Sequence, residues 1–273
     1  MATVAGSSGD RDDPRDAEWQ DRGVQSLFPT SPNDVTPDDL IELYAYPSER
    51  TWVRANFVST LDGSAQGAES RSGALSSGAD QAVFALLRSL ADVILVGGRT
   101  ARVEGYQPVL TGEVDVALRA RLGLTSTPAI AVVSRTMDLD PALLAGGDAP
   151  TLVLTTADAA EEHADKLTDT TVIDAGRPDD PAHVDAGRMI DGLAALGYQR
   201  ILCEGGPSLL YGLVTTAHLD ELCLTISPQL VGGDPTRILT SGPWFEPSVR
   251  LDLRHLLIGD GDLFSRYGVI RTG

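Results

Sequence analysis

Lysine and positive charge are what this chain of 273 residues has least of. It contains one lysine, Lys166, and its 21 Lys+Arg are outnumbered by 39 Asp+Glu, which gives a formal net charge of −18. Because nucleic acids and anionic membranes attract proteins through clustered basic residues, we expect neither as a partner. A lysine Schiff base or a P-loop lysine would depend on Lys166 alone, whose acidic neighbours indicate a solvated helix face.

Cysteine, histidine and long apolar runs are also scarce. Cys203 and Cys223 stand twenty positions apart without a CxxC motif, and the four histidines are scattered. This pattern indicates neither a disulfide framework nor a zinc site, and we expect no bound metal. No apolar run is long enough to span a bilayer, and the N-terminal segment lacks a hydrophobic signal core. These absences predict a cytoplasmic location.

The first 35 residues differ in composition from the rest. Residues 1–35 are rich in Gly, Ser, Asp, Arg and Pro, which predicts a flexible tail that ends in a short docking segment near Leu27 and Phe28. A helix is predicted from residue 36, with Thr36 as N-cap, Pro37 at the first helical position and Asp39 completing a capping box. Since no later linker or repeat is present, residues 36–273 are predicted to form a single domain.

From residue 50 onward, short β-branched apolar runs alternate with helical patterns. This alternation and the continuous apolar runs predict an α/β fold with a mostly parallel central sheet that flanking helices bury on both faces. The last third has strand patterns without long helices between them, which predicts C-terminal antiparallel strands. The predicted strands are 52–58, 93–96, 129–133, 151–154, 171–173, 200–203 and 221–226, with further strands after residues 248 and 263; the predicted helices are 78–90, 158–167 and 185–196.

Ligands of open α/β sheets bind where strands end, so the residues after each apolar run are informative. The strongest case is Glu204 to Ser208, where two glycines and a proline lead from a strand into a helix. Glycines let the backbone approach an anion closely, and a helix start supplies free N–H donors, so this turn could cradle a pyrophosphate. A tight strand-to-helix turn without a ligand explains the same residues, and the GxGxxG spacing is absent.

Three further strand ends carry polar groups. Gly97-Gly98-Arg99-Thr100 ends in a hydroxyl that could cap a helix or bind a phosphate oxygen, and Ser134-Arg135 suits the 2′-phosphate of NADPH, although Arg135 could equally be a surface residue. If Arg135 reaches that phosphate, NADPH should bind more tightly than NADH. Asp62 precedes a turn glycine. Together these strand ends suit a phosphorylated dinucleotide, with Asp62 and Glu204 as acids that could orient or protonate a polar substrate.

These strand ends belong to a longer series of motifs. The series comprises Ser59–Gly63, Ser72–Ser76, Leu86–Arg88, Val96–Thr100, Leu202–Leu209, Leu219–Leu222 and Ser227–Gly233. In order and spacing it resembles the reductase domain of bacterial and archaeal riboflavin biosynthesis, a family with a dihydrofolate-reductase-like fold. The resemblance runs from about residue 50 to the C-terminus. It implies a homodimer that uses NADPH to reduce the ribosyl group of 5-amino-6-(5-phosphoribosylamino)uracil to ribityl.

The resemblance also implies which residues form the site. Glu204 would hold polar groups of the substrate, Arg88 would pair with its phosphate, and Asp62 would orient the ribose or relay a proton, so that Asp62 and Glu204 are the catalytic candidates. The substrate-binding candidates are Asn56, Ser72, Arg88 and Glu204. With Arg135 added from the strand-end argument, the cofactor-binding candidates are Val58, Ala74, Thr100, Glu104, Ser134, Arg135, Gly205, Gly206, Pro207, Ser208, Leu209 and Leu210.

The chain departs from the family pattern in three places. Asn56 stands where many bacterial members have lysine, the segment from Glu104 to Leu110 lacks the family's substrate-phosphate arginine, and no zinc pattern of a deaminase domain precedes the reductase. Because the loop near Tyr106 differs, reduction of dihydrofolate or another pterin-like compound is an alternative. A further alternative is a non-catalytic NADP-binding protein. The N-terminal tail favours this alternative, and the presence of Asp62 and Glu204 argues against it.

Overall fold

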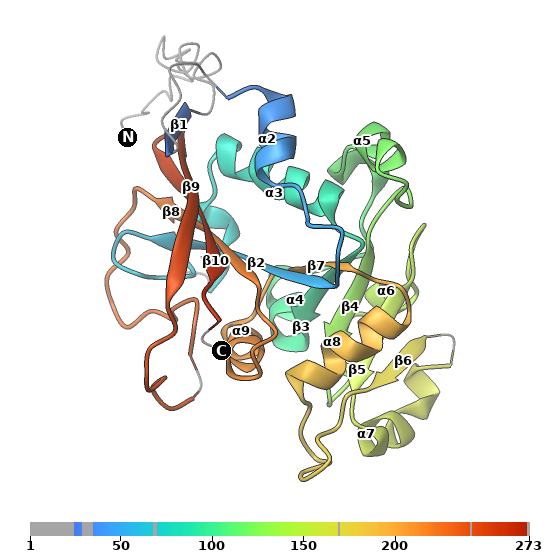
Figure 1. Ribbon diagram of the computed structural model, residues 1–273. Helices are drawn as coiled ribbons and strands as arrows, with labels where there is room; N and C mark the ends of the chain where they lie inside the picture. Colours follow the sequence, from blue (N-terminus) through green and yellow to red (C-terminus); the bar gives the residue numbers. More distant parts are fainter. Residues whose placement is uncertain (1–24, 29–34, 68–69, 169, 241, 272–273) are drawn as a thin grey trace, which may run out of the picture.

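The computed structural model describes residues 25–28, 35–67, 70–168, 170–240 and 242–271. Within them, ten strands form one sheet in the order β1-β9-β10-β8-β2-β7-β3-β4-β5-β6 (Figure 1). The strands are β1 Gln25–Phe28, β2 Trp52–Thr60, β3 Val93–Gly97, β4 Ala129–Val133, β5 Thr151–Thr155, β6 Thr171–Asp174, β7 Arg200–Cys203, β8 Glu221–Ser227, β9 Leu251–Gly259 and β10 Asp262–Val269. The α-helices are α2 Pro37–Leu43, α3 Gly78–Leu90, α4 Gly98–Glu104, α5 Val116–Arg121, α6 Pro141–Leu144, α7 Ala157–Glu162, α8 Ala186–Ala195 and α9 Pro207–Thr215, with short 3-10 turns at Gly73–Leu75, Thr111–Glu113 and Ala164–Lys166.

The pairing of the strands confirms the predicted fold class. β8, β2, β7, β3, β4, β5 and β6 pair in parallel, while β10 pairs antiparallel with β8 and β9. Because β2, β7 and β3 are parallel neighbours, their carboxyl ends meet at one edge of the sheet. The strand ends singled out in the sequence therefore lie close together.

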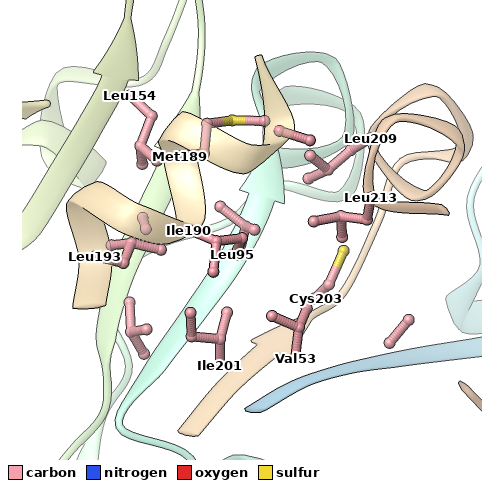
Figure 2. Packing of buried hydrophobic residues seen from close by; sticks show 14 of the residues in the cluster. Val53, Leu95, Leu154, Met189, Ile190, Leu193, Ile201, Cys203, Leu209 and Leu213 are labelled. Carbon is pink, nitrogen blue, oxygen red and sulfur yellow. The ribbon is translucent and has the colours of Figure 1, made fainter. Parts of the chain in front are cut away.

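Helices cover both faces of the sheet, as the continuous apolar strands predicted. Neighbouring residues of β7 point to opposite faces: Ile201 packs with α8 and α9, whereas Leu202 packs with α2 and α3. Figure 2 shows the first of these cores, in which Val53, Leu95 and Ile201 of three strands meet side chains of α8 and α9. These apolar layers hold the strand ends at fixed positions.

The start of the folded region agrees with the predicted capping box. The Thr36 hydroxyl accepts a hydrogen bond from the Asp39 N–H at 3.2 Å, and the Asp39 carboxylate accepts one from the Thr36 N–H at 2.9 Å. Within the predicted tail, Gln25–Phe28 forms β1 and pairs antiparallel with β9. Residues 1–24 and 29–34 lie outside the described residues, so the flexible tail and the single domain stay predictions.

One predicted helix is shorter than expected. The helix expected over 158–167 ends at Glu162 as α7, and a 3-10 turn follows after His163 leaves the helical conformation at φ −115°. The last turn of α7 contains Glu161 and Glu162 and no basic residue, which opposes the helix dipole. In the described part of the chain, no helix is long and apolar enough to cross a membrane.

Candidate functional site

A cavity of about 830 Å³ opens where β2, β3 and β7 end. Its walls come from the second half of β2, the segment 65–76, helices α3 and α4, the turn between β7 and α9, and the loop 234–240. A volume of this size suits a drug-sized ligand or a dinucleotide together with a small substrate. The cavity lies where the sequence placed the ligand.

Most of the predicted site residues line this cavity. Those that do are Asn56, Val58, Ser72, Arg88, Thr100, Glu104, Glu204, Gly205, Gly206, Pro207, Ser208 and Leu209. Glu104 also touches Ser72 directly, because its carboxylate accepts a hydrogen bond from the Ser72 N–H at 2.8 Å. Asp62, Ala74, Ser134, Arg135 and Leu210 are not part of the lining.

The two glycines after β7 bring the backbone close to the neighbouring strand end. The Gly97 N–H donates to the Gly205 carbonyl at 2.7 Å, and a Cβ added to Gly206 would lie 2.5 Å from the Thr100 hydroxyl oxygen. Gly205 has φ +111°, which a residue with a side chain rarely adopts. A side chain at Gly206 would collide with Thr100, and the free N–H groups at the start of α9 follow directly after this turn. The donor set of this cradle therefore fits the pyrophosphate of a dinucleotide.

The arginine near this cradle is Arg99 rather than Arg135. Arg99 lies in the first turn of α4, lines the cavity, and has no hydrogen-bond or ion-pair partner among the described residues. Arg135 is exposed and donates to the Ala182 carbonyl at 2.7 Å, outside the cavity lining. The prediction that Arg135 reaches a cofactor phosphate is therefore not supported by its position, because its guanidinium is held by the segment before α8.

Three other cofactor candidates also lie elsewhere. Ser134 is buried against Gly98, since a Cβ on that glycine would be 3.1 Å from the serine Cβ. Leu210 is 1% exposed and packs in the core beneath α9, because the fourth residue of the helix faces the sheet. Ala74 is exposed beside the cavity, next to the lining residue Gly73. The side chains of these three residues do not border the cavity, and their contact with a cofactor stays a prediction.

Glu204, Arg88 and Tyr106 form one hydrogen-bonded group in the wall of the cavity. The Arg88 guanidinium donates to both Glu204 oxygens, at 2.8 and 2.7 Å, and the Tyr106 hydroxyl donates to Glu204 Oε2 at 2.6 Å. Arg88 also stacks on Phe84 at 4.3 Å and lies 3.8 Å from a Glu113 oxygen. The guanidinium thus already pairs with two carboxylates, and the expected pairing of Arg88 with a substrate phosphate stays a prediction.

The electrostatics of this group follow from its burial. Burial disfavours the charged form of Arg88, but the adjacent Glu204 carboxylate outweighs it and raises the pKa of the guanidinium. Burial and the Glu204 charge both raise the pKa of Tyr106 well above its ordinary value. Tyr106 therefore stays protonated at neutral pH and acts as a donor.

Asp62 was expected to contact the substrate, but its carboxylate binds the loop that follows β8. Its carboxylate accepts hydrogen bonds from the Thr60 hydroxyl and from the N–H groups of Val231 and Gly232, the last at 2.7 Å. These bonds, that of Thr60 first, lower the pKa of Asp62. Asp62 thus ties the loop after β8 to the end of β2, and in the described structure it does not border the cavity.

Several lining residues were missed by the sequence reasoning. Asp80, Gln81 and Phe84 line the cavity from α3, one and two turns before Arg88. The helical spacing of four residues from Arg88 to Phe84 and Asp80 is the signal that could have identified them. Tyr106 was noticed only as a departure from the family pattern. No group of three or more metal-ligating side chains occurs among the residues described.

Comparison with known proteins gives the family of this chain. The sequence model of the family described as the RibD C-terminal domain matches residues 51–263. A pyrimidine reductase-like protein of Corynebacterium diphtheriae has a similar structure, with a TM-score of 0.70 and 28% identity over 81% of this chain and 93% of that one. The fold and the family match thus place the chain in the pyrimidine reductase class.

Two curated relatives define the family further. A 2,5-diamino-6-ribosylamino-4(3H)-pyrimidinone 5′-phosphate reductase of Methanothermobacter thermautotrophicus is 29% identical over 81% of this chain and 99% of its own length. A protein with the same name from Aquifex aeolicus is 27% identical over 67% of this chain and 79% of its own. The chain belongs to the riboflavin pyrimidine reductase family, and the protein is an oxidoreductase.

Proposed function

We propose that this protein uses NADPH to reduce the ribosyl group of a phosphorylated ribosylaminopyrimidine to ribityl, as a step of riboflavin biosynthesis. The observation that carries the proposal is one continuous cavity. It joins the glycine cradle at Gly205 and Gly206 to the polar group around Glu204. The cofactor and a polar substrate therefore have adjoining places.

The residues of the cradle fit the cofactor. Thr100, Ser208 and the first N–H groups of α9 would hold the pyrophosphate, and Arg99 would supply a positive charge. NADPH, when bound, supplies a hydride, and the protein's part is to position it against the substrate and exclude water. Gly97, Gly205 and Gly206 keep the floor of the cradle free of side chains.

The substrate end of the cavity offers hydrogen-bond acceptors and donors. Glu204 is held by Arg88 and Tyr106, so its orientation is fixed before a substrate binds. Asn56 and Ser72 line the same space and suit the hydroxyls of a ribosyl chain. The catalytic roles of Glu204 and Asp62 stay predictions, and the position of Asp62 favours a role in holding the loop.

Turnover tests the proposed function directly. The protein is mixed with NADPH and the ribosylaminopyrimidine phosphate in its 2-amino or its uracil form, and loss of the reduced nicotinamide absorbance is followed. We expect turnover with at least one of the two compounds. NADPH binding without turnover of either one would contradict the proposal and would favour a non-catalytic NADP-binding protein.

The cradle is tested by adding a methyl group to it. Gly206→Ala places a Cβ against Thr100, so we expect NADPH affinity to fall at least about tenfold, the effect of losing one charge-assisted hydrogen bond. Gly212→Ala in the same helix is the matched control, because its Cβ would make an ordinary contact of 3.5 Å with Ala186. Isothermal titration calorimetry measures both. Equal affinities of the two variants would contradict a cofactor site at this turn.

A pterin-like substrate is the second candidate. It is favoured by the ion pairs of Arg88 with Glu204 and Glu113, because in the described structure they occupy the cation next to Glu204 that could otherwise bind a substrate phosphate. Turnover of dihydrofolate faster than that of the ribosylaminopyrimidine phosphates would support this candidate over the first.

We also propose a homodimer, formed through the antiparallel strands near the C-terminus, and a cytoplasmic location. Sedimentation at micromolar concentration should give about twice the chain mass of 28.8 kDa. A species of 28.8 kDa alone would exclude the dimer.

A further inference from the structure

The loop after β8 presents two backbone donors to one carboxylate oxygen. The N–H groups of Val231 and Gly232 both donate to Asp62 Oδ2, at 3.1 and 2.7 Å. The other oxygen, Oδ1, accepts from the Thr60 hydroxyl. Gly232 and Gly233 have φ +66° and +75°, the left-handed conformation that favours glycine. Successive N–H groups of such a turn form an anion-binding concavity, and the anion bound here is the chain's own Asp62.

The bonds of Asp62 belong to a series that ties the loop after β8 to the segment after β2. The Leu61 N–H donates to the Gln229 carbonyl at 3.0 Å, and the Ala65 N–H donates to the Thr236 carbonyl at 2.8 Å. Residues 65–66 and 234–236 line the cavity, although Asp62 itself does not. Asp62 can therefore act on the cavity only through the wall that it holds.

The order of the strands places this wall away from the glycine cradle. Along the sheet the order is β8-β2-β7-β3, and the cradle lies between the ends of β7 and β3. The wall lies where β8 and β2 end, and β2 also supplies the substrate-binding candidate Asn56 to the cavity. A change in this wall should therefore affect the substrate more than the cofactor.

We propose that Asp62 is a positioning residue, whose carboxylate fixes the wall of residues 229–236 and thereby sets the affinity for the substrate. Hydride and proton transfer proceed without it, because it does not border the cavity in the described structure. The motifs Ser59–Gly63 and Ser227–Gly233 then form one device, in which the first supplies the anion and the second its donors. The inference rests on the proposed function for the identity of the substrate.

The exposure of Asp62 makes the proposal testable from solution. Its hydrogen bonds, that of Thr60 first, lower the pKa of Asp62, so the carboxylate is charged at neutral pH. Since Asp62 is exposed, solvent ions can reach the same donors once the side chain is shortened. A small carboxylate such as formate should then take its place.

The test removes the carboxylate and supplies one from solution. The native chain, Asp62→Ala, Asp62→Asn and Asp39→Ala are compared in sodium formate and in sodium chloride of equal concentration. Asp39 is the matched control, because it also accepts from a threonine hydroxyl and a backbone N–H, but it lies on α2, which supplies no residue to the cavity lining. The measurements are hydrogen–deuterium exchange of the peptide 229–240 and steady-state kinetics with NADPH and the ribosylaminopyrimidine phosphates.

In chloride, the peptide 229–240 of Asp62→Ala should exchange about tenfold faster than in the native chain, as for lost hydrogen bonds to a charged group. The KM for the substrate should rise at least about fivefold, while kcat and the KM for NADPH change less than about twofold. Asp62→Asn keeps one acceptor oxygen and should lie between the two. Formate should reverse both changes in Asp62→Ala and leave the native chain and Asp39→Ala unaffected.

Two results would overturn the proposal. One is exchange of the peptide 229–240 that is unchanged in Asp62→Ala, or faster exchange that formate does not reverse. The other is a fall in kcat without a rise in KM, which would make Asp62 a catalytic residue. If the native protein turns over neither compound, the proposed function fails, and the exchange data alone decide whether Asp62 holds the wall.

Discussion

Three arginines are candidates for binding a phosphate, and their guanidinium groups differ in their hydrogen-bond partners. Arg88 donates to both oxygens of Glu204, Arg135 donates to a backbone carbonyl outside the cavity, and Arg99 lines the cavity without a partner among the described residues. Arginine binds phosphate well only where its donors are free. At this scale, Arg99 rather than Arg135 is the arginine that we propose for binding a cofactor phosphate.

Replacement of Arg99 tests this assignment. Arg99→Ala should weaken NADP⁺ binding by roughly 1.5 to 3 kcal/mol, the value of a hydrogen bond to a charged group. Arg102→Ala is the control, because Arg102 lies on the same helix and pairs with Asp138 at 2.6 Å on the surface. Titration with NAD⁺, which lacks the 2′-phosphate, shows which phosphate Arg99 binds. If Arg99 binds the 2′-phosphate, Arg99→Ala leaves the affinity for NAD⁺ unchanged. If it binds the pyrophosphate, the affinities for NAD⁺ and NADP⁺ both fall. Equal NADP⁺ affinities of the two variants would refute the assignment.

At the scale of elements, a buried ionic cluster attaches α2 to the sheet. Glu221 of β8 accepts hydrogen bonds from Arg54 of β2 and Arg266 of β10, and Arg54 also donates to the Tyr44 carbonyl at the end of α2 at 2.7 Å. Burial would raise the pKa of Glu221, but Arg54 and Arg266 outweigh it and lower that pKa. No residue of α2 is fully buried, so these bonds, together with partly buried side chains, hold the helix.

Removal of one partner should therefore be costly. Arg54→Leu leaves Glu221 buried with one guanidinium instead of two, and we expect a loss of about 3 to 5 kcal/mol in the free energy of unfolding. Arg254→Leu, which breaks the exposed pair with Asp252, should cost about 0 to 1 kcal/mol. Urea unfolding monitored by circular dichroism measures both. Similar losses in the two variants would mean that the cluster does not anchor α2.

At the scale of the whole molecule, we expect stability to depend on pH through a buried histidine. His255 is 1% exposed, packs edge-on against Tyr44 at 4.7 Å between ring centroids, and has an Nε2 atom without a partner in the described structure. Burial, and next the charge of Arg266, lower its pKa from 6.5 to about 4. Between these two values the unfolded chain binds more protons, so the free energy of unfolding decreases as the pH falls.

His255→Phe removes this proton site and keeps a ring at the position. The native protein should lose up to about 3 kcal/mol more stability than the variant between pH 7 and pH 4. Urea unfolding at several pH values gives the two curves, and contributions from the many carboxylates cancel in their difference. Parallel curves would show that His255 does not titrate in this range.

The predictions from sequence succeeded where the signal is local. The helix over Gly78–Leu90 and the strands Ala129–Val133 and Arg200–Cys203 have the predicted bounds, because periodicity and capping residues act within a few positions. The glycine turn at Gly205 and Gly206 was also found, since glycine directly after a strand indicates a close backbone approach. Contacts between side chains that are far apart in the chain were not predicted from the sequence.

Thus most strands, the longer helices, the class of fold and the sheet edge where the cavity lies follow from the sequence alone, because each depends on patterns of neighbouring residues. Which charges are free was decided by the tertiary structure. Glu204 meets Arg88 across 116 positions and Tyr106 across 98, and only the folded sheet brings them together. The same packing leaves Asp80 without a partner in the described cavity, because whether a buried charge is satisfied depends on every element around it.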